Sequence, residues 1–381
     1  KFKMKYLLFF FIFFAFNTWS HDKYYKFDAS NYKKMMFHNL DKDHAKKYLD
    51  KYKANKLLVR NIKKPYSGKI IDGHAHPRKK NKKSLKAGTK YFMQDMPKLV
   101  DDAKVDFTMI MVTPNTYSSK SKFNYYYEFA DKNKNIKTLC HSNFVGMAND
   151  TTYSKKDILN EYKQTITKFK NGLCYGVGEV GPIHYNKKKK DPPNYDGWQR
   201  PVDIDLEHWA LNLAFKFAHD NNMPIVLHVE PFYEIKKINR ISEVKKFYKK
   251  KCKQYPKAKL VASHTGMMPP KDLEELFNHC NNLYSDWKIA FHWSSLWGFE
   301  DLHIPNDYRF KLHEIWAQSF EKFPDRYYFG SDHKLGKSPS HDHYAIHYMK
   351  HVRLMIGSLN SETQSKIAYK NAAKLFKVNI D

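Results

Sequence analysis

The residues of this chain that could carry out chemistry are histidines and carboxylates at the ends of short apolar runs. His74 and His76 stand two residues apart, just after the run 69–72. Side chains two apart on a strand point to the same face, so both imidazoles can reach one metal ion at about 2.0–2.1 Å. The pair alone is a weak signal, because a chain with 20 histidines can produce one by chance.

Four further apolar runs end in residues of the same chemical type. Glu179 ends a glycine-flanked run, and His228, His264 and Asp332 each end another. A carboxylate at the end of a buried strand is costly unless it is paired or binds a metal. Five runs that end in the order His-x-His, Glu, His, His and Asp therefore predict a metal centre.

Eight apolar runs alternate with helical stretches, which predicts βα units with parallel strands. Eight units over about 260 residues fit a (β/α)8 TIM barrel, whose catalytic residues lie at the carboxyl ends of the strands. A doubly wound sheet is the alternative, although no Gly-x-Gly-x-x-Gly follows the first strand. The predicted strands are 69–72, 107–113, 137–141, 175–179, 224–228, 260–264, 283–286 and 327–332, and the predicted helices are 92–103, 125–132, 155–171, 204–221, 241–254, 272–281, 310–323 and 361–376.

The strand ends resemble those of the amidohydrolase superfamily. IIDGHAH, GVGEVG, PIVLH, VASHTG and PDRYYFGSD are similar to its metal-binding strand ends, and IAYKNAAKLF is similar to the last helix of its amidohydrolase-related (amidohydrolase 2) group. GVGEVG also resembles the TatD-type hydrolases, which carry a glutamate at strand four. The resemblance covers about residues 69–378 and implies a metal-bearing barrel.

The resemblance implies a role for each strand-end residue. His74, His76 and Asp332 would hold a first ion, and His228 would join them in a mononuclear site. The ion would lower the pKa of a bound water and polarise the substrate. Asp332 could take the proton from that water and pass it to the leaving group.

One or two divalent ions fit this set of residues. In a binuclear site, Glu179 would bridge to a second ion held by His228 and His264. With one ion, His264 would instead orient water or stabilise an oxyanion. Mixed histidine and carboxylate ligation favours zinc, with manganese, iron and nickel as alternatives.

Several residues beside the strand ends are candidates for substrate binding: His184, Tyr185, Glu230 and Trp293. The lysine-rich loops 78–90 and 187–190 follow strands one and four, and their charge favours an anionic small-molecule substrate. Asp72 points away from the histidine pair and is predicted to play a structural part.

The formal net charge of +28 does not by itself indicate a nucleic-acid-binding protein. Only seven of the 67 basic residues are arginines, the residue type that binds phosphates and bases bidentately. We therefore expect solvated surface lysines and no dedicated nucleic-acid partner.

Residues 1–20 have the pattern of a secretory signal peptide. Three lysines precede an apolar run over 6–16, which is too short to span a bilayer. We expect a periplasmic or secreted protein with no stable membrane span, and an uncleaved membrane anchor is the alternative. Residues 21–64 show helical spacing of apolar residues and are predicted to pack as a helical extension on the domain 65–381.

The four cysteines, Cys140, Cys174, Cys252 and Cys280, stand in unrelated contexts; export would allow disulfides, and free buried thiols are the default expectation. Taken together, these features predict an exported metal-dependent hydrolase that acts on an ester, lactone, amide or phosphoester. The alternatives are a metal-dependent decarboxylase on the same scaffold, a TatD-like nuclease, and a non-catalytic basic surface protein that binds polyanions. The last alternative leaves the strand-end residues unexplained.

Overall fold

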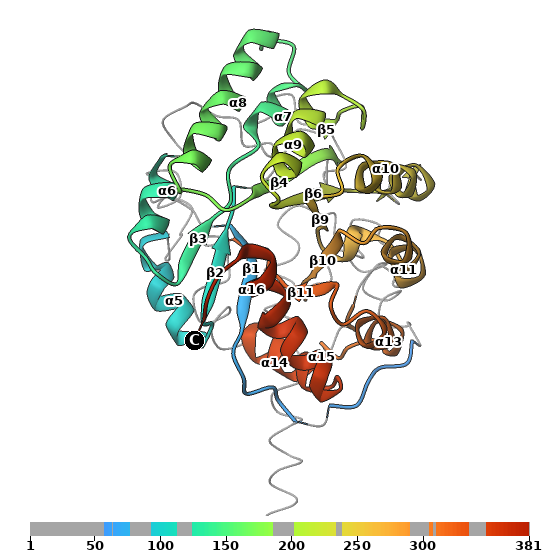
Figure 1. Ribbon diagram of the computed structural model, residues 1–381. Coiled ribbons are helices and arrows are strands. Elements are labelled where there is room, and N and C mark those ends of the chain that lie inside the picture. Colours follow the sequence, from blue (N-terminus) through green and yellow to red (C-terminus); the bar gives the residue numbers. More distant parts are fainter. Residues whose placement is uncertain are drawn as a thin grey trace, which may run out of the picture.

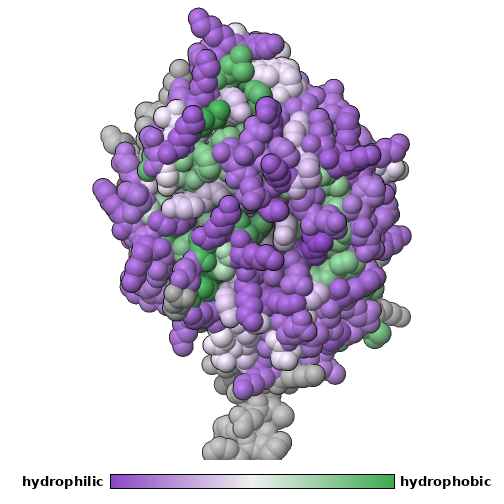
Figure 2. Space-filling view, in the orientation of Figure 1, coloured by the Kyte–Doolittle hydropathy of each residue, from purple (hydrophilic) through white to green (hydrophobic). Residues whose placement is uncertain are grey.

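Parallel strands surround the centre of the molecule and helices lie outside them in the computed structural model (Figure 1). The structure describes residues 57–62, 64–76, 93–112, 124–185, 202–233, 238–289, 305–307, 310–334 and 348–380. Hydrophilic side chains cover most of the face shown in Figure 2, with smaller apolar areas between them.

The strands form two main sheets and one short hairpin. All neighbours in the main sheets are parallel except β5, which runs antiparallel to β4. The first sheet has the order β12 (His333–Lys334), β1 (Ile71–His76), β2 (Phe107–Ile110) and β3 (Ile136–Thr138). The second has the order β11 (Tyr327–Phe329), β10 (Leu283–Trp287), β9 (Lys259–Ala262), β6 (Pro224–Val229), β4 (Val177–His184) and β5 (Val202–Asp203), and β7 (Phe232–Tyr233) pairs with β8 (Ile238–Asn239).

The two sheets are connected on both sides. A parallel bridge between Cys140 and Val177 links the chain after β3 to β4. On the other side, β11 pairs with β10, and the chain then continues into β12, which pairs with β1. These links follow the sequence order of the eight predicted strands, which is the strand order of a (β/α)8 barrel.

Helices follow the strands at the predicted places. Helix α8 begins with a capping box, in which the Ser154 hydroxyl accepts from the Asp157 backbone N–H and the Asp157 carboxylate accepts from the Ser154 N–H. The helices are α5 (Met96–Asp102), α6 (Asn124–Asp131), α7 (Asn143–Met147), α8 (Lys155–Lys170), α9 (Trp209–Asp220), α10 (Ile241–Gln254), α11 (Pro270–His279), α13 (Glu314–Lys322), α14 (Met349–Gly357), α15 (Ser361–Ser365) and α16 (Asn371–Phe376). None of the helices in the described part of the chain is long and apolar enough to cross a membrane.

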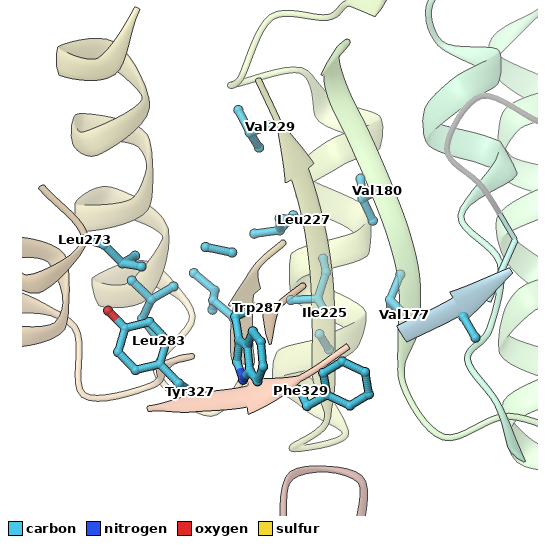
Figure 3. Close-up of a cluster of buried hydrophobic side chains, with 14 of the residues drawn as sticks. Val177, Val180, Ile225, Leu227, Val229, Leu273, Leu283, Trp287, Tyr327 and Phe329 are labelled. Carbon is cyan, nitrogen blue, oxygen red and sulfur yellow. The ribbon is translucent and has the colours of Figure 1, made fainter. Parts of the chain in front are cut away.

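The core is divided into two apolar clusters because side chains alternate along each strand. On β6, Val226 belongs to a smaller cluster that includes Tyr328 and residues of α16. The neighbouring Ile225 and Leu227 belong to the larger cluster, which includes residues of the outer helices. His228 shares the face of Val226, so the alternation directs it to the inside. Side chains of the larger cluster on β4, β6, β10 and β11 are drawn in Figure 3, among them Val177, Val180, Val229, Trp287 and Phe329.

The N-terminal lead-in is extended where the structure describes it. Val59 forms an antiparallel bridge with His313, and the Arg60 guanidinium pairs with Glu314 at 2.6 Å and Glu321 at 3.1 Å. This differs from the helix expected at the end of 21–64, because the backbone hydrogen-bonds to a distant segment and not to itself. Residues 1–56, with the predicted signal peptide, lie outside the described residues.

All four cysteines form disulfides, so the prediction of free thiols is wrong. Cys140 pairs with Cys174, and Cys252 pairs with Cys280. The first pair joins the segment after β3 to the segment before β4, and the second joins α10 to the end of α11. The spacing of the cysteines along the sequence does not indicate either pair, because the partners come together only in the folded chain.

Candidate metal centre

The carboxyl ends of five strands bring the six predicted ligands together. His74 and His76 lie on β1, Glu179 on β4 and His228 on β6, while His264 follows β9. The sixth, Asp332, follows β11. Three overlapping groups of three are formed by these residues, and within each group the candidate ligand atoms lie within 4.8 Å of one another.

The shortest distances are centred on His76 and Glu179. The Nε2 atoms of His74 and His76 are 3.1 Å apart. His76 Nε2 is also 3.1 Å from Glu179 Oε2 and 3.0 Å from Asp332 Oδ1. Its other nitrogen, Nδ1, lies 2.9 Å from the Met111 carbonyl oxygen, which can only accept a hydrogen bond. The Nδ1–H therefore faces this carbonyl, and Nε2 faces the carboxylates.

The second half of the site is built around Glu179 and His264. His228 Nδ1 lies 2.8 Å from Glu179 Oε1. His264 Nε2 is 3.8 Å from the same oxygen and 3.5 Å from Asp332 Oδ2. This Nε2 atom is buried and has no hydrogen-bond partner among the described residues. A buried imidazole nitrogen without a partner, facing two carboxylates, fits a divalent cation of the zinc type.

Asp286 supports two of these histidines, and the sequence analysis did not assign it a role. Its carboxylate is fully buried at the end of β10. Oδ2 lies 3.0 Å from His74 Nδ1, and Oδ1 lies 3.1 Å from His264 Nδ1. Such contacts leave the Nε2 atoms of both histidines to face the site. One signal was available, because the run 283–286 ends in an acidic residue like its neighbours.

Two residues of the site have left-handed backbone conformations. His264 has φ 57° and Asp332 has φ 50°. The His264 backbone N–H donates to Asp286 Oδ1 at 2.8 Å, and the Asp332 N–H donates to the His74 carbonyl at 2.8 Å. Left-handed backbone is uncommon outside glycine and is often found at functional sites. These hydrogen bonds hold both side chains at the centre.

The eighth strand approaches the first very closely at Gly330. A Cβ atom there would lie 2.6 Å from the Cβ of His74. Asp72 fixes the same junction, since its carboxylate accepts from the Ser331 backbone N–H at 2.8 Å and from the Ser331 hydroxyl at 2.6 Å. The structural part predicted for Asp72 agrees with these contacts.

Burial and charge shift the histidine pKa values in opposite directions. Burial acts to lower the pKa of His74, but the carboxylates of Asp286 and Glu179 outweigh it and raise that pKa to about 10. Burial and the ammonium of Lys288 lower the pKa of His264 to about 4. The imidazoles of His76 and His74 outweigh burial and hold the pKa of Glu179 well below its usual range. Glu179 is thus ionised and available to a cation.

Two of the four predicted substrate-binding residues lie beside His228, and a third, Tyr185, contacts one of them. Glu230 is buried, with Oε1 3.1 Å from His228 Nε2 and Oε2 accepting from the Tyr185 backbone N–H at 2.6 Å. His184 Nε2 lies 3.8 Å from Glu230 Oε1. Trp293 and the loops 78–90 and 187–190 lie outside the described residues. Substrate binding by all four residues stays a prediction.

Two solved structures of other proteins have folds similar to that of this chain. No family model and no curated protein matches the chain. An amidohydrolase from Burkholderia multivorans is 11% identical and has a TM-score of 0.51, covering 82% of this chain and 100% of its own. An uncharacterised TIM-barrel protein from Bordetella bronchiseptica is 12% identical and has a TM-score of 0.50, covering 81% of this chain and 99% of its own. These likenesses support the predicted (β/α)8 fold.

Proposed function

We propose that this chain is a metal-dependent hydrolase of the amidohydrolase superfamily, built on a (β/α)8 barrel. One observation carries the proposal: histidines and carboxylates from five strand ends meet at one buried point, with candidate ligand atoms within 4.8 Å in each group. Unpaired, such a cluster would be costly to bury. The same residues carry the sequence resemblance to the superfamily, and the amidohydrolase from B. multivorans has a similar fold.

Five of the six strand-end residues are proposed to hold the metal. His74, His76 and Asp332 hold a divalent ion, which we propose to be zinc. Glu179 and His228 lie where they complete this site or begin a second one. When bound, the ion supplies Lewis acidity to a water molecule and to the oxygen of the scissile group.

Asp332 and His264 handle the proton of the attacking water. Asp332 Oδ1 faces His76, while Oδ2 lies 3.5 Å from His264 Nε2. Because Asp286 accepts a hydrogen bond from Nδ1–H of His264, the Nε2 atom of His264 has a lone pair that can accept a hydrogen bond from a water molecule and orient it. Asp332 then accepts the proton and returns it to the leaving group. The scissile bond belongs to an ester, lactone, amide or phosphoester of a small molecule.

We propose export for the whole protein, with action in the periplasm or outside the cell. The two disulfides support this proposal, because such bonds persist in oxidising compartments and are rare in reducing ones. The signal-like pattern of residues 1–20 supports it independently. Sequencing the N-terminus of the protein purified from its native source tests it, since an uncleaved end would leave only the anchor alternative.

Metal analysis and two variants test the proposed function. Protein purified without added metal or chelator should contain one or two divalent ions per chain by mass spectrometry. The double variant His74→Ala with His76→Ala should lose them, while His279→Ala, at an exposed position, should not. Asp332→Asn should fold and lose about 10²–10⁴-fold in turnover on a panel of esters, lactones, amides and phosphoesters. A double variant with full metal content and activity would contradict the assignment.

A further inference from the structure

We propose that Lys288 binds an anionic oxygen group of the substrate, such as a carboxylate, next to the metal centre. This inference rests on the proposed function and narrows its substrate class. Lys288 follows β10 directly and stands two residues after Asp286. It was not among the residues that the sequence singled out.

Lys288 is more exposed to solvent than the two site residues nearest to it. Lys288 Nζ lies 2.5 Å from Asp332 Oδ2. Its side chain is 25% exposed, whereas that of Asp332 is 15% exposed and that of His264 is 4% exposed. A substrate that approaches Asp332 from solvent therefore meets this ammonium on the way to the reacting atoms.

The hydrogen-bonding capacity of Lys288 exceeds what Asp332 takes up. An ammonium carries three donors, and Asp332 Oδ2 accepts one of them. The same contact occupies Oδ2, while Oδ1 lies 3.0 Å from His76 Nε2 on the metal side. A partly exposed cation with donors to spare is suited to a second anionic oxygen, and charged hydrogen bonds are among the strongest in proteins.

Charge balance explains why a cation is needed there. Glu179, Asp286 and Asp332 bring three carboxylates to one buried point. A divalent ion alone would leave this cluster negative and would repel an anionic substrate at short range. The ammonium of Lys288 offsets one of these negative charges and reduces that repulsion. The site can then accept a negatively charged substrate.

Two small anions that differ in charge provide the test. Acetate offers one carboxylate, which the metal can take, whereas malonate offers a second one for Lys288. We would measure the Kd of each anion by calorimetry on metal-loaded wild type, Lys288→Met and Lys288→Arg. Lys322→Met is the matched control, because Lys322 is 61% exposed on α13 and pairs there with Glu274. Metal content is measured for every protein.

We expect Lys288→Met to weaken malonate binding about tenfold or more and acetate binding less than twofold, with unchanged metal content. Lys288→Arg should retain most of the malonate affinity, and the control should match wild type. Equal weakening of both anions or loss of the metal would overturn the proposal, because Lys288 would then only hold Asp332 in place. Unchanged binding of malonate would also overturn it, because Lys288 would then not contact the second carboxylate. Wild type that binds no metal would refute the proposed function itself, and this inference with it.

Discussion

Replacement of Asp286 by asparagine should damage the metal centre without removing any ligand. Asparagine has the shape of aspartate but offers one acceptor oxygen and one NH₂ donor. The oxygen can remain at Oδ1, where His264 donates from both its backbone N–H and Nδ1. The NH₂ group then faces His74 Nδ1, 3.0 Å from Oδ2 in the wild type. His74 must accept that bond, so its proton moves to Nε2 and blocks the ligand atom.

The size of this effect follows from the supporting role of the carboxylate. Loss of a group that orients a metal-binding histidine costs about 10–100-fold in metal affinity. This corresponds to about 1.4–2.7 kcal/mol. The free energy of unfolding of the metal-free protein should fall by about 1–3 kcal/mol, because Asp286 is fully buried and loses a charge-assisted bond.

Competition with a chromophoric chelator would measure the zinc affinity of wild type and Asp286→Asn, and urea unfolding would give the stabilities. Asp325→Asn is the matched control, since Asp325 is 68% exposed and pairs with Lys366 on the surface. This control should change neither quantity by more than about 1 kcal/mol. A zinc affinity of Asp286→Asn within twofold of the wild-type value would refute the tautomer argument.

Two further predictions concern stability. Burial lowers the pKa values of His141 and His313 to about 4. The unfolded chain takes up these protons near pH 6.5, so stability should fall as the pH drops from about 6.5 to 4, by up to about 3 kcal/mol for each histidine. Urea unfolding of His313→Gln should show a shallower fall, and a slope equal to that of wild type would contradict this. Reduction of the disulfides should lower the free energy of unfolding by about 3–4 kcal/mol per bridge, because they close loops with separations of 34 and 28 residues. An unchanged urea midpoint after verified reduction would disprove that estimate.

The sequence sufficed for the strands and for the grouping of the site because both depend on local patterns. A short apolar run followed by a ligand-type residue marks the end of a buried strand, and parallel strands bring such ends to one edge. His74 and Asp332 are 258 positions apart, yet the strand order alone predicts that they meet. Their roles as ligands stay predictions until metal is measured.

Other features depend on contacts that no local pattern encodes. Asp286 ends a run as the candidate ligands do, but only the structure shows that it lies beside His74 and His264. The partner of Cys140 is Cys174, which lies just before β4, and a cysteine spacing of 34 does not indicate this pairing. The segment around Val59 has helical spacing of apolar residues, but pairing with His313 outweighs this weak local preference.

The hydrogen bond from the Asp332 backbone N–H to the His74 carbonyl, at 2.8 Å, joins the first strand to the last. A growing chain therefore carries its histidine pair long before the carboxylate that completes the first ligand set has been synthesised. Metal binding by the proposed ligands would have to wait for the entire barrel, because these residues converge only in the folded protein. The proposed ion would then be selected from the metals available where and when folding ends, and not from those that the ribosome-bound chain meets.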